Sequence, residues 1–381
     1  MKVLHVISNL GVGGAEVFLE NLLTAWSNPQ DEQIICSFYG GEIAQRLQQK
    51  GYDVHILMPD ASSSVFSYVR AVFKLSNYIN DHSPRVVISS LWLANVVARL
   101  LCFFKKIPSV SVLHNNADFL GFSKRCIDVV TLCFFGKHAV AVSASVKHSY
   151  ERFFVLGHFL KKKIRIIQNG VAVDQLLAGA EQNAPKVLSG GHRNRFIFGS
   201  VGRLIPSKGL KNLILAFDLF LKKQFPLPED KELRPILCIV GDGPERAALK
   251  ELVADLALEA QVLFCGHQSD VSSFYYRFSS YISSSVSEGQ SLALLEALAV
   301  GLPVVVTHAC AGELFNEDLD GVVLESNEVA QLALGMVKVY TDYHLYADHA
   351  KKRSVFIRAF YSIVRTAEQY AEFIDELLRV F

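Results

Sequence analysis

Short apolar runs alternate with longer stretches of helical character along residues 1–175. The runs are rich in Val and Ile and are bounded by polar or glycine-containing segments, which is typical of strands joined by helices in a parallel sheet. They read KVLHVIS, EQIICSF, DVHIL, RVVISS, SVSVLH, HAVAVS and KIRIIQN. We therefore predict that residues 1–175 form an α/β domain around a parallel sheet.

A second series of the same kind begins at residue 196 and reads FIFGSVGR, PILCIVGDG, QVLFCGH, SYISSS and LPVVVT. Each predicted strand ends in Gly, Ser or Thr just before a loop, so small and polar residues gather at the carboxyl edge of the sheet. Open α/β sheets bind their ligands at that edge. We predict a second α/β domain over residues 196–360, with a ligand site at its carboxyl edge.

The segments outside these two series differ in character. Residues 176–195 belong to a polar, irregular stretch that begins near Val173, and we predict that they form an interdomain linker. The tail, residues 361–381, carries apolar residues at helical spacing. These residues are Ile363, Ala367, Tyr370, Phe373, Leu377 and Val380. We expect a C-terminal helix that either closes the second domain or returns to the first.

No segment of the chain has the composition of a membrane span. The longest apolar stretch, Leu91–Phe104, contains Arg99 and is shorter than the ~20 residues that a bilayer span needs. The amino terminus shows no long apolar segment followed by a small-residue cleavage site. We therefore expect no transmembrane helix and a cytoplasmic location.

The seven cysteines are odd in number and scattered, without a C-x-x-C pair. This usage is typical of buried thiols in a reducing compartment. It indicates neither a disulfide framework nor a cysteine metal site.

Charge is distributed unevenly between the two halves of the chain. Residues 1–175 carry 18 Lys and Arg and 12 Asp and Glu, which gives a net charge of +6. The rest of the chain carries 20 and 25, which gives a net charge of −5. Basic residues of the first half stand beside aromatic ones in CFFKKIP, FLGFSKR and CFFGKHA. Such stretches suit contact with anionic lipid headgroups. A solvated basic rim over ordinary core aromatics explains the same pattern equally well.

The segment NLGVGGAE, residues 9–16, joins the first predicted strand to a predicted helix. A glycine turn at a helix start favours anions such as phosphate, because the N–H groups there point outward. The segment fails as a dinucleotide fingerprint, since Glu16 stands where the third glycine of G-x-G-x-x-G belongs.

The segment SEGQSLALLEALAVGLPVVVT, residues 287–307, combines two carboxylates with a helix start. Glu288 precedes the predicted helix and Glu296 lies within it, about 10 Å further on at ~1.5 Å rise per residue. The residues of the helix start can hold a phosphate through their N–H groups. They are Gly289, Gln290, Ser291 and Leu292. Two glutamates that are merely solvated on a helix are the ordinary alternative.

Upstream of this segment, two cations lie between the first predicted strand of the second domain and the helix that follows it, at the same edge of the sheet. Arg203 follows a strand, and Lys208 stands five residues later. Together they suit a diphosphate that gains charge as its bond to a sugar breaks. The segment VGDGPE, which contains Gly241, ends another predicted strand at the same edge. Surface charges near a turn are the alternative for both cations.

These segments occur in the order GGAE, NGV…D, VGRL…KG, GDGPE and EGQSLALLEALAVGLPVV. The chain thereby resembles, over nearly its whole length, the family 4 retaining glycosyltransferases. The resemblance implies the GT-B fold, in which two Rossmann-like domains face each other across a cleft.

The resemblance also implies a role for each matched residue. Glu296 would bind the ribose hydroxyls of the donor, and Glu288 the donor sugar near its reacting carbon. Arg203 and Lys208 would bind the diphosphate. Two further sites come from the first domain. His114 would reach the donor sugar, and Gly13 and Gly14 would close over the phosphates. An ordinary strand-end histidine remains the alternative for His114.

The implied reaction transfers a sugar from a nucleoside diphosphate, most commonly uridine diphosphate, to a hydroxyl of a glycan or lipid-linked acceptor with retention of configuration. We expect no cofactor and no metal, because the only D-x-D-like sequence, Asp318 and Asp320, is better explained by a turn. The chain departs from the family pattern after PVVVT. Family members commonly have a pair of glycines before a Glu there, whereas this chain has the single Gly312 before Glu313.

Two other functions fit the same fold. A nucleotide-sugar epimerase would isomerise the donor without an acceptor. A noncatalytic nucleotide-sugar-binding subunit would bind it without turnover. The four charged site residues favour the transferase, and its class suggests bacterial surface polysaccharide synthesis at the inner membrane face.

Overall fold

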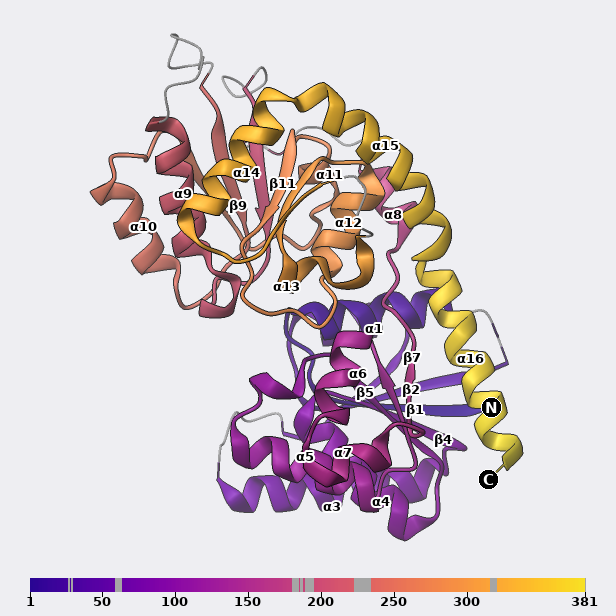
Figure 1. Ribbon diagram of the computed structural model, residues 1–381. Helices are drawn as coiled ribbons and strands as arrows, with labels where there is room; N and C mark the ends of the chain where they lie inside the picture. The colour runs from indigo at the N-terminus through magenta and orange to yellow at the C-terminus, as the bar shows by residue number, and fades with distance from the viewer. Residues whose placement is uncertain are drawn as a thin grey trace. The chain divides into compact units, whose positions relative to one another are not determined.

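The computed structural model divides into two compact units, Met1–Gly170 with Ile363–Phe381, and Val171–Ser362 (Figure 1). The chain passes from the first unit to the second after Gly170 and returns after Ser362. The structure describes residues 1–26, 28, 30–58, 64–179, 185, 188, 195–222, 234–315 and 321–380.

The first unit contains a seven-stranded sheet in the order β3-β2-β1-β4-β5-β6-β7. All neighbouring strands are parallel, and each of the seven predicted runs matches one of them. The strands are β1 (Lys2–Asn9), β2 (Glu32–Tyr39), β3 (Asp53–Ile56), β4 (Val86–Ser90), β5 (Ser109–Leu113), β6 (His138–Ala141) and β7 (Ile164–Ile166).

Helices cover both faces of this sheet. They are α1 (Gly14–Ala25), α2 (Glu42–Gln49), α3 (Val65–His82), α4 (Trp92–Lys105), α5 (Phe122–Phe134), α6 (Ala144–Glu151), α7 (Phe154–Leu160) and α16 (Ile363–Val380). The strand order runs one way from β1 to β3 and the other way from β4 to β7, so right-handed crossovers place α1 and α2 on one face and α3, α4 and α5 on the other. Two separate apolar clusters, one beneath each layer, follow from this division.

The C-terminal helix α16 belongs to the first unit, which resolves the choice that its apolar stripe left open. It packs against α1, where the rings of Phe18 and Tyr370 lie 6.2 Å apart. Arg165 Nη1 and Glu376 Oε2 form an ion pair of 2.7 Å, and Thr366 Oγ1 donates a hydrogen bond to the carbonyl of Gln168. The buried stripe of α16 therefore completes the core of the first unit.

A fully buried ion pair joins α4 to α5. Arg99 Nη1 lies 2.6 Å from Asp128 Oδ1, and both side chains are almost completely shielded from solvent. Arg99 Nε also donates to Ser111 Oγ on β5, and the Tyr150 hydroxyl of α6 donates to the other oxygen of Asp128. Arg99, the charged residue within the longest apolar stretch of the sequence, thus belongs to a buried network that links four elements: α4, β5, α5 and α6.

The second unit contains a six-stranded parallel sheet in the order β10-β9-β8-β11-β12-β13. The strands are β8 (Ile197–Val201), β9 (Ile236–Val240), β10 (Val262–Gly266), β11 (Ser280–Ser283), β12 (Val304–Thr307) and β13 (Val322–Leu324). The five predicted runs form β8 to β12. The strand β13 was not predicted, because its three residues are too few to show a strand pattern. Its pairing with β12 defines it.

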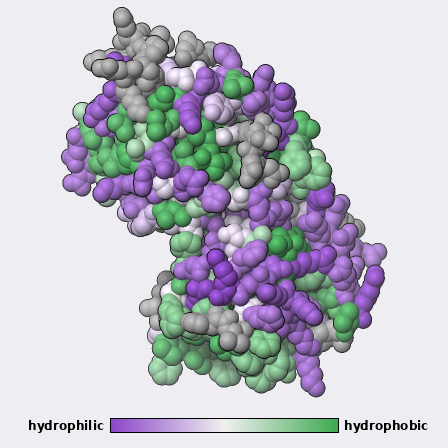
Figure 2. Space-filling model, in the orientation of Figure 1, coloured by the Kyte–Doolittle hydropathy of each residue, from purple (hydrophilic) through white to green (hydrophobic). Residues whose placement is uncertain are grey.

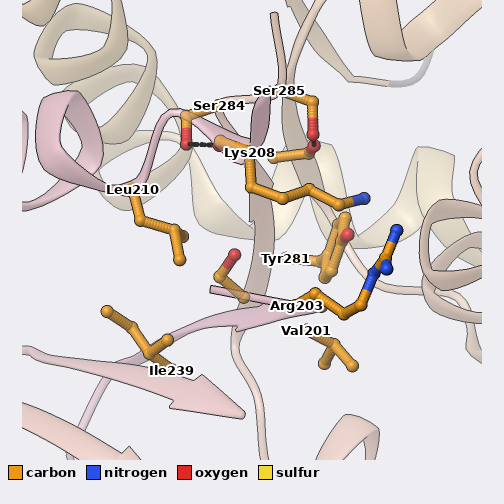
Figure 3. A pocket seen from close by; sticks show the side chains of 11 residues that line it. Val201, Arg203, Lys208, Leu210, Ile239, Tyr281, Ser284 and Ser285 are labelled. Carbon is orange, nitrogen blue, oxygen red and sulfur yellow. Dashed lines mark hydrogen bonds between the residues drawn. The ribbon is translucent and has the colours of Figure 1, made fainter. Parts of the chain in front are cut away.

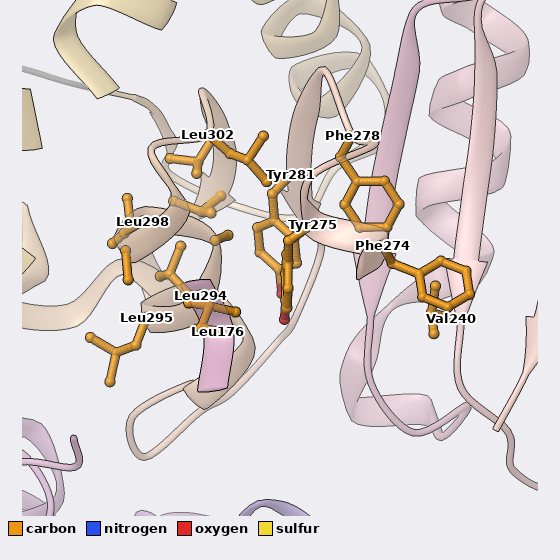
Figure 4. Packing of buried hydrophobic residues seen from close by; sticks show 14 of the residues in the cluster. Leu176, Val240, Phe274, Tyr275, Phe278, Tyr281, Leu294, Leu295, Leu298 and Leu302 are labelled. Atoms are coloured by element: carbon orange, nitrogen blue, oxygen red, sulfur yellow. The ribbon is translucent and has the colours of Figure 1, made fainter. Parts of the chain in front are cut away.

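Helices also cover both faces of the second sheet, over two apolar clusters. The helices are α8 (Val173–Ala178), α9 (Leu210–Lys222), α10 (Arg246–Asp255), α11 (Ser272–Tyr275), α12 (Leu292–Val300), α13 (His308–Ala311), α14 (Val329–Thr341) and α15 (Tyr343–Phe360). Figure 4 shows the cluster in which the rings of Tyr275 and Tyr281 lie beside Leu294 of α12. This cluster fixes α12 against the sheet.

The predicted linker, residues 176–195, begins inside a helix instead of an irregular segment. Leu176 is buried in the core of the second unit, and α8 packs against α11 and α12. Most of residues 180–194 lies outside the described residues. The two segments in which the chain passes between the units lie side by side, since the N–H of Val171 donates a hydrogen bond of 2.7 Å to the carbonyl of Tyr361.

All seven cysteines are free thiols. Cys238 on β9 and Cys265 on β10 lie with their sulfur atoms 3.1 Å apart. Within the part of the chain that the structure describes, no helix combines the length and apolar character needed to cross a membrane.

Replacing Asp128 by Ala is expected to lower the free energy of unfolding by about 3–5 kcal/mol, because it leaves the buried Arg99 guanidinium without its counter-charge. Asp118→Ala is the matched control. That carboxylate is 45% exposed and pairs with Arg125 at 2.8 Å, so its loss should cost about 1 kcal/mol or less. Urea denaturation followed by circular dichroism measures both. Equal losses would contradict a structural role for the buried pair.

Candidate functional site

A pocket opens at the carboxyl ends of β8, β9 and β11, which are neighbours in the second sheet (Figure 3). The strand order runs from β8 to β10 in one direction and from β11 to β13 in the other, so the switch in direction falls between β8 and β11. Ligands of open α/β sheets bind at such switch points, because the loops diverge there and leave a crevice. The pocket lining includes Arg203, Lys208, Tyr281, Ser284 and Ser285.

Glycines allow the loops around this pocket to approach closely. Gly241 has a φ of +137°, and a Cβ atom there would lie 1.9 Å from the carbonyl oxygen of Gly202. Gly209 has a φ of +63°, and a Cβ atom there would lie 2.3 Å from the carbonyl oxygen of Ser284. Gly241, predicted as a binding residue, thus has a backbone role: it lets the end of β9 contact the loop that carries Arg203.

Lys208, which lines the pocket, forms an ion pair with Glu288, although the two are 80 residues apart in the sequence. The same carboxylate oxygen accepts a hydrogen bond of 2.8 Å from Ser285 Oγ. Ser284 Oγ donates to the carbonyl of Lys208 at 2.8 Å, which joins the two loops. Arg203 is exposed, and in Figure 3 its side chain extends in the same direction as that of Lys208.

The helix α12 begins beside this ion pair. The Ser291 hydroxyl caps it by accepting a hydrogen bond from the N–H of Leu294. Backbone N–H groups of the helix start, which includes Gly289, Gln290 and Leu292, can contact a phosphate there.

Glu296 lies about one turn into α12 and is held by a tyrosine that the sequence did not single out. The Tyr275 hydroxyl donates to Glu296 Oε2 at 2.7 Å. The pKa of Glu296 is raised to about 7, chiefly because the carboxyl is buried; the hydrogen bond from Tyr275 lowers this pKa and the charge of Asp270 raises it. No motif marks Tyr275. Ser284 and Ser285, at the end of β11, were indicated in the sequence only as part of a polar strand end.

Three of the predicted residues lie in the first unit, at the ends of β1 and β5. Burial lowers the pKa of His114 to about 4, so its imidazole is neutral at physiological pH. His114 Nε2 lies 3.3 Å from Ser90 Oγ, at the end of β4. Gly13 is the N-cap residue of α1, and a Cβ atom on Gly14 would meet no atom within 4 Å. These residues share the carboxyl edge of the first sheet around its own switch point, between β1 and β4.

The segment after β12 contains the departure from the family pattern. It forms α13 and then a single 3-10 turn, Gly312–Leu314, in which Gly312 has a φ of +52°. Asp318 and Asp320 lie outside the described residues. Among the described side chains, no group of three or more metal-ligating residues is found.

Two family models match most of the chain. Residues 12–175 match Glycosyltransferase Family 4, and residues 189–358 match Glycosyl transferases group 1. The chain belongs to the family 4-type glycosyltransferases. The resemblance inferred from the sequence motifs is thereby confirmed.

Curated relatives of this glycosyltransferase come from archaea and bacteria. An uncharacterized glycosyltransferase of Methanocaldococcus jannaschii is 26% identical over 262 residues, which cover 65% of this chain and 61% of the relative. The UDP-Gal:alpha-D-GlcNAc-diphosphoundecaprenol alpha-1,3-galactosyltransferase of Escherichia coli is 28% identical over 183 residues, which cover 47% of this chain and 46% of the relative. The chain thus spans less than two thirds of the length of these relatives.

Solved structures extend the likeness of the fold to the whole chain. Anabaena Alr3699/HepE in complex with UDP-glucose is 21% identical, with a TM-score of 0.83 over 99% of this chain and 100% of that one. The lipopolysaccharide glycosyltransferase WaaG is 16% identical, with a TM-score of 0.74 over 98% and 99%. The glycosyltransferase therefore has the GT-B fold with two Rossmann-like domains, as predicted.

Glu296→Gln is expected to stabilise the glycosyltransferase at pH 8 and to change little at pH 5. The folded-state pKa of about 7 lies above the ordinary value of 4.5, so the folded protein favours the neutral carboxyl, and stability is lost as the pH rises through 7. The glutamine removes this loss, a gain of up to about 3 kcal/mol at pH 8. Urea denaturation at both pH values measures it. An equal effect at pH 5 and pH 8 would contradict the raised pKa.

Proposed function

We propose that this glycosyltransferase moves a sugar from a uridine diphosphate sugar to a hydroxyl of a glycan or lipid-linked acceptor, with retention of configuration. The observation that carries the proposal is the Lys208–Glu288 ion pair at the switch-point pocket. It holds a cation that suits a diphosphate next to a carboxylate that suits a sugar.

The diphosphate would lie against Arg203, Lys208 and the first turn of α12. Both cations carry flexible side chains that extend from the pocket lining, and the helix start adds its partial positive charge. As the bond between sugar and phosphate breaks, negative charge grows on the leaving phosphate, and these groups stabilise it more than they stabilise the intact donor. Two protein cations at this position are the reason why we propose a reaction without a metal cofactor.

Glu288 would serve the sugar. Ser285 and Lys208 hold one carboxylate oxygen of Glu288, which fixes the direction of the side chain. Binding of the diphosphate to Lys208 would loosen the ion pair and direct the carboxylate to sugar hydroxyls. His114 would act as a neutral hydrogen-bonding group and not as a cation, because of its low pKa.

The proposed donor and acceptor classes are based on the names of similar proteins. The Escherichia coli relative is named for transfer from UDP-Gal to a diphosphoundecaprenol-linked sugar, and the Anabaena structure was solved with UDP-glucose. A rhizobial relative is named for lipopolysaccharide core biosynthesis. These names support a uridine diphosphate donor and a lipid-linked acceptor in surface polysaccharide or lipopolysaccharide synthesis.

Lys208→Ala and Glu288→Ala are each expected to lower turnover at least about 100-fold, since each removes a group that contacts the transition state. Lys211→Ala, an exposed lysine on α9 outside the pocket, should leave turnover unchanged. Purified protein is incubated with uridine diphosphate sugars and lipid-linked acceptors, and released nucleotide and product mass are measured, with and without EDTA.

Unchanged turnover in both pocket variants would overturn the assigned roles, and inhibition by EDTA would overturn the metal-free reaction. The anomeric configuration of the product, from NMR, tests retention. Exchange of a sugar proton in deuterated water without an acceptor would instead indicate an epimerase, and binding without any reaction a noncatalytic subunit.

Affinity for UDP-glucose is expected to fall about tenfold as the pH drops below 7, because ribose hydroxyls donate more strongly to an ionised Glu296 than to a neutral carboxyl. Tyr275→Phe removes the hydrogen bond that lowers this pKa, so the transition should move to higher pH. The neighbouring Tyr276→Phe is the control. Calorimetric titrations between pH 6 and 9 measure the midpoint. A midpoint that Tyr275→Phe leaves in place would contradict ribose binding by Glu296.

A further inference from the structure

The helix layer of α3, α4 and α5 in the first unit exposes large aromatic side chains to solvent. The exposed fractions are 87% for Phe66, 66% for Phe73, 74% for Phe104, 72% for Phe122 and 64% for Phe134. Figure 2 shows hydrophobic surface where these helices lie at the lower end of the view. Soluble proteins rarely gather exposed apolar groups of this size on one face without a partner.

The helix α3 carries two apolar stripes where its place in the fold requires one. Ala71, Leu75 and Ile79 face the sheet and are buried. Phe66 and Phe73, two turns apart, lie on the solvent side with Val69 between them. The outer stripe contributes nothing to the core, so the fold does not explain it.

The aromatic groups of α4 and α5 are continuous with one another. The ring of Phe103 lies 5.2 Å from that of Phe135, and the ring of Phe104 lies 6.3 Å from it. Lys105 Nζ at the end of α4 donates to Asn80 Oδ1 on α3 at 2.5 Å. The three helices therefore present one surface, which we call the aromatic face.

The alternative that the sequence left open, ordinary core aromatics beneath a basic rim, is wrong for these stretches. Of the six phenylalanines in CFFKKIP, FLGFSKR and CFFGKHA, five are exposed. They are Phe103, Phe104, Phe119, Phe122 and Phe134. The aromatic and basic side chains share the same surface.

The charge of the aromatic face is positive. Arg70, Lys106 and Lys124 are exposed on or next to α3, α4 and α5, together with the half-buried Lys105. The acidic residues of these three helices are Asp81 and Asp128, and Asp128 is buried against Arg99. Asp118, just before α5, is paired with Arg125.

We propose that the aromatic face docks this protein on an anionic lipid bilayer, with the phenylalanines in the boundary of the acyl chains and the lysines among the headgroups. Aromatic and aliphatic groups flanked by Lys and Arg are the combination that binds such an interface. The inference rests on the proposed function, because a lipid-linked acceptor is the reason why the protein would bind a membrane.

A second copy of the chain fits the aromatic face less well than a bilayer does. A two-fold dimer would place the same face of both copies together, and its lysines would oppose each other. Like charges across an interface disfavour association. Anionic lipid headgroups supply the opposite charge, and a fluid bilayer needs no shape complementarity with the phenylalanines.

Co-flotation of the purified full-length protein with vesicles tests the proposal without donor or acceptor. We expect binding to vesicles of equimolar phosphatidylglycerol and phosphatidylcholine, and much weaker binding to phosphatidylcholine alone. Phe66→Ser with Phe73→Ser should lower partitioning roughly tenfold per residue. Lys105→Glu with Lys106→Glu should lower it by more than about 30-fold, and high salt should weaken it in the wild type.

Matched controls come from α15 of the second unit. Phe356 and Phe360 are 51% and 50% exposed, and Lys351 and Lys352 are exposed. Phe356→Ser with Phe360→Ser, and Lys351→Glu with Lys352→Glu, should bind as the wild type does. Circular dichroism checks that each variant folds.

Three results would overturn the docking proposal. They are no flotation of the wild type with anionic vesicles, equal losses in the control variants, or lipid-independent dimers that the aromatic-face substitutions dissociate. Vesicle binding without transferase activity would refute the proposed function alone. Turnover of a water-soluble acceptor without vesicle binding would refute the docking alone.

Discussion

Close contact between the strand-end loops of the second sheet is the constraint on which the site depends. At the ends of β8 and β9, a side chain on Gly241 would overlap the carbonyl of Gly202, and Gly209 lies against the carbonyl of Ser284 in the same way. These contacts bring the loop of Arg203 and Lys208 against the loop of Glu288. Larger residues at Gly209 or Gly241 would separate the loops, and the Lys208–Glu288 pair would lose its geometry.

Two kinds of buried charge in this chain have different physical roles. Arg99 and Asp128 are enclosed on all sides and tie four elements of the first unit together. Burial raises the pKa of Glu296, and its Oε2 accepts a hydrogen bond from a tyrosine hydroxyl instead of from a cation. An ionised carboxylate held in this way opposes folding, and proteins retain such groups where a ligand uses them.

The pattern of apolar runs predicted twelve of the strands that the structure contains, because strands buried on both faces form continuous runs of β-branched residues. It missed β13, which is defined by pairing with β12 and not by its own three residues. The apolar stripe of α16 predicted a helix but not its partner, since any complementary apolar surface satisfies a stripe. Of the site, the charged residues were predicted from their motifs, whereas Tyr275 was not, because it acts through Glu296 and stands in no motif.

The sequence by itself determined the family, the two parallel sheets and the charged residues of the candidate site, because local spacing and residue type carry that information. Only the tertiary structure decided that Lys208 reaches Glu288 across 80 positions, since the strand order places β8 next to β11. It likewise decided that the phenylalanines beside the lysines face solvent. Helical spacing shows which residues share a face, and packing against the sheet determines which face is covered.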